Sequence, residues 1–237
     1  MIKNLLIIAQ SILITVKYSC LAIYRSFSYS RSATDLVVYN WSKALLKAVH
    51  ASVRIHNPHH VSLKSNHPYV LMSNHTSLYD IPIIFMTFPD NSIRMIAKKE
   101  LFKVPLWGHA MKTSEFVAVD RKNSTQAIKD LEEVQQKMKS GIIPWIAPEG
   151  TRSRDGKLGP FKKGGFMLAI QTHATIIPIA IKGAANILPP KTMNFQTHQT
   201  VDVVIGKPVD ASQYSVKNRM ALLQEVHKQI KDILIQE

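Results

Sequence analysis

The sequence predicts an α/β fold with a mostly parallel central sheet flanked by helices, preceded by two N-terminal helices. Short apolar runs alternate with helical patterns from about residue 66 onward, which is typical of strands that each lead into a helix. The first 55 residues instead form two long helical patterns. A chain of 237 residues is long enough for one such domain with a modest accessory element.

The first helix is predicted over Leu5 to Tyr24, an apolar stretch that reaches the roughly 20 residues needed to span a bilayer. Lys17 interrupts it, and a central lysine costs about 2.5–3.5 kcal/mol on insertion. Lys17 lies off centre, however, where its ammonium can reach the interface. The segment from Tyr18 to Arg25 fits a signal-peptide cleavage site poorly, so we expect the helix to remain and to meet a membrane.

The second segment, Leu36 to Val53, has apolar residues at helical spacing with basic residues between them, which predicts an amphipathic, basic helix. The apolar positions are Val37, Val38, Trp41, Leu45, Ala48 and Val49, and the basic ones are Lys43, Lys47 and His50. We expect both helices to bind or enter one membrane face. The alternative is a spanning anchor followed by an ordinary core helix. The predicted domains are residues 1–58, the membrane-associating helices, and residues 59–237, the α/β domain.

Six strands and three helices are predicted in the α/β domain. The strands cover residues 69–72, 93–97, 116–119, 142–147, 176–181 and 201–205. The helices cover residues 124–139, 163–173 and 215–235. Strands that alternate with helices favour a single domain with a mostly parallel sheet.

The chain is strongly basic, with a formal net charge of +14 that is spread along the sequence. Basic proteins of this kind usually meet phosphates on nucleic acid, on an anionic membrane or on a substrate, and a merely solvated surface is the alternative. No interleaving of aromatic and basic residues indicates nucleic acid. The one cysteine, Cys20, excludes an intramolecular disulfide and fits a reducing compartment.

A histidine and an aspartate follow the first predicted strand, in the segment Ser73 to Asp80 (SNHTSLYD). His75 and Asp80 are five residues apart, which is about 140° round an ideal helix. They meet only if His75 lies in the turn and Asp80 in the first turn of the next helix. The carboxylate would then fix the imidazole tautomer and leave the other nitrogen to take a proton. The alternative is that both residues cap the helix.

A second polar block, Pro148 to Ser153 (PEGTRS), follows the fourth predicted strand. Arg152 offers a planar fork of donors that suits phosphate oxygens, and Glu149 is placed to hold it. Gly150 permits a sharp turn of the backbone. Lys163 leads into the N-terminus of the next predicted helix, which favours anions. A basic surface loop is the alternative.

The remaining patterns are weaker. The basic pair Arg121 and Lys122 follows another predicted strand. His56, His59 and His60 have no nearby carboxylates, so we expect no metal site there. The sequence has no Gly-x-Ser-x-Gly elbow, no phosphate-binding P-loop and no Gly-x-Gly-x-x-Gly fingerprint, which argues against the common hydrolase and nucleotide-binding classes.

Together these blocks resemble the glycerolipid acyltransferases of the lysophosphatidic acid acyltransferase family. Asn74 to Asp80 is similar to the family's His-x4-Asp motif, and Pro148 to Ser153 is similar to its Glu-Gly-Thr-Arg block. Ile177 to Ile179 resembles its later hydrophobic-proline motif. The resemblance covers about residues 60–210 and includes the order and rough spacing of the motifs.

One block departs from the family pattern Gly-x-x-Phe-hydrophobic-Asp-Arg. Glu115 stands where the family usually has glycine, and Ala118 stands where it has phenylalanine. Asp120 and Arg121 are retained, so contact of Arg121 with a phosphate remains the expectation.

The resemblance implies an O-acyltransferase that moves a fatty acyl chain from acyl-CoA or acyl carrier protein to the sn-2 hydroxyl of lysophosphatidate, giving phosphatidate in phospholipid biosynthesis. It implies a glycerol-3-phosphate acyltransferase-like fold and one-step transfer, with His75 as base, Asp80 as its orienting partner and no metal or other cofactor. The residues expected at the acceptor phosphate are Arg152, Arg121, Glu149, Gly150 and Thr151, with Asn74, Lys98, Lys99 and Lys163 as secondary candidates.

Two other functions remain open. The acceptor can be another lysolipid or a glycerol-phosphate-type compound, and acceptor preference would decide this. A more distant alternative is a basic membrane-binding protein without catalysis. The expected partners are a lysophospholipid, the acyl donor and an anionic membrane surface, with no nucleic acid. The expected location is the cell membrane, with the catalytic domain on the cytoplasmic side.

Overall fold

The computed structural model describes residues 2–27, 30–120 and 124–236. The chain groups into two compact units, each built from two separate stretches of sequence. The first unit contains residues 1–50 and 81–144, and the second contains residues 51–80 and 145–237. The predicted domain boundary between residues 58 and 59 stays a prediction.

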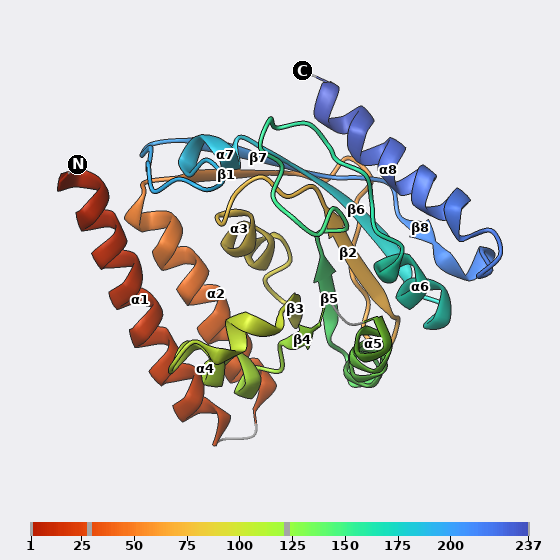
Figure 1. Cartoon of the computed structure of the whole chain (residues 1–237), viewed down its shortest axis with the longest axis horizontal. Helices are drawn as coiled ribbons and strands as arrows, with labels where there is room; N and C mark the ends of the chain where they lie inside the picture. The colour runs from red at the N-terminus through yellow and green to blue at the C-terminus, as the bar shows by residue number, and fades with distance from the viewer. Residues whose placement is uncertain (1, 28–29, 121–123, 237) are drawn as a thin grey trace. The chain divides into compact units, whose positions relative to one another are not determined.

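Two long helices, α1 (Ile2–Ser26) and α2 (Arg31–Ala48), lie side by side in the first unit (Figure 1). A shorter helix, α4 (Trp107–Thr113), packs against α1. α1 keeps most of its apolar side chains on the surface, since its only buried residues are Ile7, Ser19 and Ala22. Within the described residues, α1 is the one helix long and apolar enough to cross a membrane. An N-terminal helix of this character suggests membrane association.

α2 differs from α1 because its apolar side is buried. Val37, Leu45 and Ala48, three of the positions predicted to face a membrane, are 5%, 8% and 8% exposed. These side chains therefore pack inside the protein, as in an ordinary core helix, which is the alternative for this segment. The exposed apolar surface of the N-terminal region belongs mainly to α1, where Leu6 and Leu13 are among the most exposed residues.

The sequence predicts a helix that continues to Val53, and this prediction is wrong. Val53 lies in the strand β1 (Ser52–His56), where it pairs in parallel with Val201 of β7 (Thr200–Ile205). His50 has a φ of 52°, in the left-handed region, so a right-handed helix cannot continue through it. The β-branched residues that follow fit a strand better than a helix.

The first unit also contains two parallel strands, β3 (Ile93–Lys98) and β4 (Val117–Val119). A short 3-10 segment, η1 (Lys99–Lys103), follows β3, and α5 (Ser124–Lys139) packs against β4. The helix α3 (Asp80–Thr87) precedes β3 in the chain. The predicted strands and the predicted helix over residues 124–139 are confirmed here to within a residue or two.

Charged pairs connect α2 to the later part of the first unit. The guanidinium of Arg94, whose side chain is only 2% exposed, donates to Asp35 Oδ1 at 2.6 Å. Arg31 donates to both carboxylate oxygens of Glu115, at 2.7 and 2.8 Å. These contacts tie the second N-terminal helix to segments that lie 59 and 84 residues later in the sequence.

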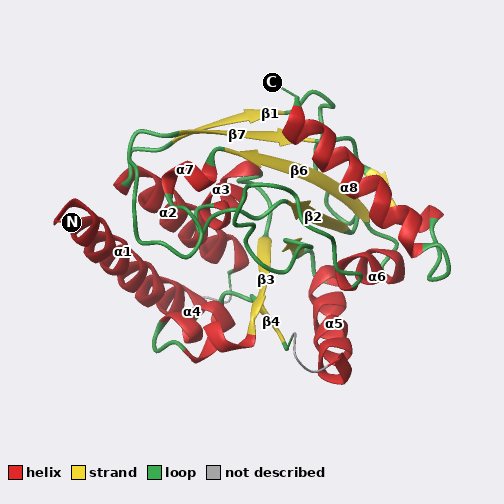
Figure 2. Ribbon diagram, turned by 45° about the horizontal axis from the view of Figure 1, so that its top comes forward, coloured by secondary structure: helices red, strands yellow, loops and turns green. Residues whose placement is uncertain are grey.

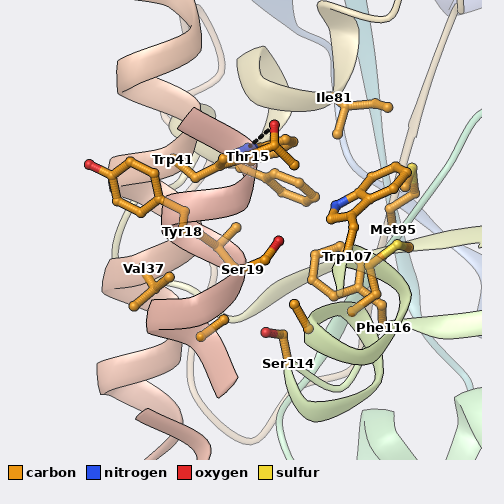
Figure 3. A pocket seen from close by; sticks show the side chains of 15 residues that line it. Thr15, Tyr18, Ser19, Val37, Trp41, Ile81, Met95, Trp107, Ser114 and Phe116 are labelled. Carbon is orange, nitrogen blue, oxygen red and sulfur yellow. Dashed lines mark hydrogen bonds between the residues drawn. The ribbon is translucent and has the colours of Figure 1, made fainter. Parts of the chain in front are cut away.

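An apolar pocket of about 50 Å³ lies in the first unit between α1 and α2 on one side and α3, β3, α4 and the residues just before β4 on the other. Figure 3 shows Tyr18 of α1 and Trp41 of α2 on one side of the pocket, and Met95, Trp107 and Phe116 opposite them. The Trp41 indole N–H donates to the Thr15 hydroxyl at 3.2 Å, which satisfies the polar atom that the ring brings into the pocket. The lining is therefore suited to apolar groups.

The second unit is a sheet with the strand order β1, β7, β6, β2, β5. The further strands are β2 (Tyr69–Ser73), β5 (Ile143–Ile146) and β6 (Thr175–Lys182), and β8 (Val209–Asp210) pairs with β6. β2 runs parallel to both β5 and β6, whereas β6 runs antiparallel to β7. The predicted mostly parallel sheet is confirmed.

Helices cover this sheet. α8 (Arg219–Ile235) runs along β6 (Figure 2), and α6 (Gly164–Gln171) packs against α8. Two short helical segments link these elements: α7 (Ala184–Ile187) connects β6 to β7, and η2 (Ala211–Gln213) connects β8 to α8. α8 begins four residues later than predicted, and the sequence patterns did not reveal β1, β8, α4 or α7, which are short.

Candidate active site

The candidate site begins at the end of β2, a strand buried along its whole length. The next residue, Asn74, is 2% exposed and uses its side-chain amide to bind the backbone of Ile181 in β6. Its Nδ2 donates to the Ile181 carbonyl at 2.9 Å, and its Oδ1 accepts from the Ile181 N–H at 2.8 Å. Asn74, a secondary candidate for substrate contact, therefore fixes where the turn leaves the sheet.

His75 and Asp80 meet as the five-residue spacing predicts. His75 lies in the turn, Asp80 is the first residue of α3, and Nδ1 of His75 is 2.8 Å from Oδ2 of Asp80. Because a carboxylate only accepts, Nδ1 carries the proton and Nε2 keeps a lone pair. Nε2 has no hydrogen-bond partner among the described residues, and the side chain is 18% exposed.

Asp80 also holds the turn itself. Its Oδ2 accepts from the backbone N–H groups of Thr76 and Ser77, at 2.7 and 2.8 Å. The residue is 0% exposed, and its Oδ1 has no hydrogen-bond partner in the described part of the chain. The Asp80 carboxylate therefore has both expected roles. It binds the backbone N–H groups at the start of the helix, and it orients the imidazole ring of His75.

Aromatic and hydroxyl side chains pack against the His75 turn and form hydrogen bonds around it. The rings of His75 and Trp145 meet edge to face, with centroids 6.1 Å apart. The Trp145 indole N–H donates to the Ser73 hydroxyl at 3.0 Å, and the Ser77 hydroxyl donates to the Leu188 carbonyl at 2.8 Å. These buried contacts leave the imidazole little freedom to move.

Glu149 connects the second polar block to the His75 turn. Its Oε1 accepts from the backbone N–H of His75 at 2.9 Å, and its Oε2 accepts from the backbone N–H of Gly159 at 2.9 Å. The backbone N–H of Ser153 donates to the His75 carbonyl at 2.8 Å. Both sides of His75 are therefore bound to this block. Burial of the carboxyl group, which is 7% exposed, raises the pKa of Glu149.

The expected contact between Glu149 and Arg152 is not formed within the described residues, because both carboxylate oxygens accept from backbone N–H groups instead. Arg152 is half-buried, Thr151 is exposed, and the guanidinium has no ion-pair partner in that part of the chain. Gly150 has a φ of 75°, a conformation that favours glycine, so the predicted sharp turn is present.

The other candidate residues are distributed more widely. Arg121 lies outside the described residues. Lys98 is exposed at the end of β3 in the first unit, and Lys99 forms an ion pair with Asp120 at 3.2 Å. Lys163 is exposed directly before α6. The second unit therefore brings together His75, Asp80, Asn74 and the Glu149 block.

Two residues of the basic stretch Gly159 to Gly165, which the sequence predicts to favour anions, make contacts that sequence reasoning did not predict. Gly159 contributes only a backbone N–H to Glu149, and no side-chain pattern marks such a role. Lys162 lies across Gly150, a contact that depends on how the loop folds back. The described residues contain no group of three or more histidine, cysteine, aspartate or glutamate side chains placed to hold a metal ion.

The chain is similar to several known proteins. It is 35% identical over 148 residues to "1-acyl-sn-glycerol-3-phosphate acyltransferase BAT2, chloroplastic" of Brassica napus and 34% identical over 152 residues to the LPAT1 enzyme of Arabidopsis thaliana. These matches cover 62% and 64% of this chain but 42% of each relative, so the chain spans about two-fifths of their length. The crystal structure of the lysophosphatidic acid acyltransferase PlsC from Thermotoga maritima aligns with a TM-score of 0.81 and 26% identity, covering 100% of this chain and 98% of that one.

The family model named Acyltransferase matches residues 52–182. This match spans more than half of the 237 residues and contains the His75 turn, Asp80 and the Glu149 block. The chain therefore belongs to the Acyltransferase family.

Proposed function

We propose that this chain is an O-acyltransferase that moves a fatty acyl chain from a thioester donor, acyl-CoA or acyl carrier protein, to the sn-2 hydroxyl of lysophosphatidate, giving phosphatidate in phospholipid biosynthesis. The observation that carries this proposal is the 2.8 Å hydrogen bond from His75 Nδ1 to Asp80, which leaves Nε2 directed to accept a proton. The chloroplast relatives and PlsC are named as acyltransferases of 1-acyl-sn-glycerol phosphates, which supports the choice of acceptor.

In the proposed reaction, Nε2 of His75 takes the proton of the acceptor hydroxyl as its oxygen attacks the thioester carbonyl. The buried carboxylate of Asp80 stabilises the imidazolium that forms. When the tetrahedral intermediate collapses, the carbon–sulfur bond breaks and the imidazolium returns the proton to the departing thiolate. General-base catalysis of this kind contributes about 10²–10⁴-fold to the rate.

The acceptor phosphate is proposed to bind Arg152, whose guanidinium has no ion-pair partner among the described residues. Arg121 remains a proposed second contact. Gly150 and Thr151 place the loop, with Lys98 and Lys163 as secondary candidates. Glu149 is assigned a different task from phosphate binding, because its oxygens hold the His75 backbone and Gly159.

The acyl donor already carries an activated thioester, so the proposed transfer needs no metal or other cofactor. The exposed apolar surface of α1 supports binding to the membrane in which a lysophospholipid would lie. A formal net charge of +14 supports an anionic lipid surface as partner. The proposed orientation places the catalytic part on the cytoplasmic side, which fits a chain with the single cysteine Cys20.

Detergent-solubilised protein will be given labelled acyl-CoA or acyl carrier protein with lysophosphatidate, comparing wild type, His75→Ala and His59→Ala. His59 is an exposed histidine of the second unit and serves as the matched control. Phosphatidate should form with wild type and His59→Ala, and His75→Ala should lose about 10²–10⁴-fold of the rate. Equal turnover in His75→Ala would refute the assigned base.

The same assay distinguishes the alternatives. Product from a different lysolipid or from a glycerol-phosphate-type acceptor, with none from lysophosphatidate, would replace the acceptor but keep the base. Salt-sensitive binding to anionic vesicles that is unchanged in His75→Ala, without acyl transfer to any acceptor, would indicate a non-catalytic membrane-binding protein.

A further inference from the structure

The loop that follows the Glu149 block folds back onto it. The backbone N–H of Lys162 donates to the Pro148 carbonyl at 2.8 Å, and Gly159 donates to Glu149 three residues earlier in the loop. These bonds fix the position from which the Lys162 side chain leaves the backbone. The side chain therefore starts beside the block that is bound to the His75 turn.

The Lys162 side chain lies over Gly150. A Cβ atom added to Gly150 would be 2.9 Å from both Cε and Nζ of Lys162, so the space of the missing side chain is filled by the end of the lysine. Gly150 is favoured at this position by its φ of 75°, and the end of the flexible Lys162 side chain occupies the open space above it. Thr151, which follows Gly150 in the chain, lines the same open cavity as Lys162.

The ammonium of Lys162 has no carboxylate partner in the described part of the chain. Lys162 lines an open cavity of about 490 Å³ together with the exposed cations Arg154 and Lys157. A volume of this size falls in the range of ligand pockets. The carboxylates of this cavity are already engaged: Glu149 accepts two backbone N–H groups, and Asp155 accepts from the Ser153 hydroxyl and the Lys157 N–H. The cavity is therefore suited to an anion.

We propose that Lys162, held over Gly150, binds a phosphate ester of one of the two substrates in the cavity that it lines with Arg154 and Lys157. The inference rests on the proposed acyl transfer, in which the acceptor and acyl-CoA both carry phosphates. An ammonium is a compact point charge that suits phosphate oxygens. The hydrogen bonds that Glu149 accepts from the backbone N–H groups of His75 and Gly159 link this loop to the catalytic turn.

The test compares Lys162→Met with Lys162→Arg and with Lys207→Met, a matched loss of charge at an exposed lysine of the same unit. Methionine keeps an unbranched side chain over Gly150 but removes the charge. Each variant is assayed with lysophosphatidate and with monoacylglycerol, which lacks the acceptor phosphate. The donors are acyl-CoA and the acyl thioester of N-acetylcysteamine, which lacks the donor phosphates.

With both full substrates, Lys162→Met should lower kcat/KM by about 10- to 100-fold, as expected for loss of a hydrogen bond to a charged group. Lys162→Arg should retain part of the rate, and Lys207→Met should match wild type. If the acceptor phosphate is the ligand, the loss disappears with monoacylglycerol. If the donor phosphates are the ligand, it disappears with the N-acetylcysteamine thioester. An equal loss in all four combinations, or none in any, overturns the proposal.

A binding measurement separates this inference from the proposed function. Calorimetric titration with inorganic phosphate and with glycerol 3-phosphate needs no turnover. Lys162→Met should weaken binding at least several-fold, and Lys207→Met should not. If wild type transfers no acyl group but this difference is found, the proposed function fails and the phosphate site stands. If the three proteins bind phosphate equally, the site fails whatever the activity.

Discussion

The buried charges of the two units are held in different ways. In the second unit, Asp80 and Glu149 bind backbone N–H groups of the His75 turn and its neighbouring loop. In the first unit, Asp35 binds Arg94 across 59 residues, a contact between two side chains. A carboxylate bound to the backbone sets the shape of a turn, whereas an ion pair between elements holds those elements together. Substitutions should therefore affect activity in the second unit and the free energy of unfolding in the first.

The largest effect is expected from Asp80→Asn. Asparagine can keep one oxygen at the position of Oδ2, but it removes the negative charge that stabilises the imidazolium of His75. We expect kcat to fall by about 10³–10⁴-fold, as when the orienting carboxylate of a histidine base is lost. Steady-state kinetics would measure this, with the exposed Asp90→Asn as control. A loss confined to KM would show that Asp80 acts on substrate binding.

The next effect is expected from Arg94→Met, in stability. Removing the 2%-exposed guanidinium leaves Asp35 without its ion-pair partner, and breaking such a buried pair costs about 3–5 kcal/mol. Urea denaturation would measure the free energy of unfolding. The double variant Arg94→Met with Asp35→Leu should recover a large part of the loss, because no unpaired charge remains. If the single variant costs less than about 1 kcal/mol, the ion pair is not what holds α2.

The same contrast explains what the sequence could predict. The His75–Asp80 pair was predictable because its two residues are five positions apart and a strand end leads directly into them. The partners of Glu149 were not, because Gly159 and His75 offer backbone N–H groups that no residue type encodes. Long-range pairs such as Asp35 with Arg94 leave no local pattern either. The strands with buried apolar runs were found from those runs, whereas β1, exposed along most of its five residues, has none.

Glu149→Gln is expected to have a smaller effect on activity than Asp80→Asn. Glutamine can accept only one of the two backbone N–H groups, so the His75 turn loosens, and we expect kcat/KM to fall by about 10- to 100-fold near neutral pH. The pH profile adds a second readout. Burial raises the pKa of Glu149, so wild-type activity should begin to fall, as the pH is lowered, at a higher pH than an ordinary glutamate would give.

The effect of Glu149 on stability has the opposite sign. A raised pKa in the folded state means that folding favours the protonated form, so this group's contribution to stability is lost as the pH rises through its folded-state pKa. Glu149→Gln should remove that part of the pH dependence in urea denaturation. An acid limb of the activity profile that is unchanged in Glu149→Gln would assign the limb to another group.

The smallest effect is expected at Glu115, where substitutions can separate the cost of the strained backbone from the gain of the ion pair with Arg31. Glu115 stands where the family usually has glycine, and its φ of 64° lies in the left-handed region that costs a non-glycine residue about 1 kcal/mol. Its ion pair with Arg31, in which both side chains are about one-third exposed, offsets that cost. Glu115→Ala should lose the pair and keep the strain, whereas Glu115→Gly should lose both.

We therefore expect Glu115→Gly to be more stable than Glu115→Ala by about 1 kcal/mol, and close to wild type, in urea denaturation. Arg31→Ala should be at least as destabilising as Glu115→Ala, because it removes the same pair and also the bonds of Arg31 to the Ser140 carbonyl and hydroxyl. If glycine and alanine are equally stable, the left-handed conformation carries no cost here and the ion pair alone accounts for Glu115. If glycine is the less stable of the two, the backbone is held by the glutamate itself, and the first unit would then fix a turn as the second unit does.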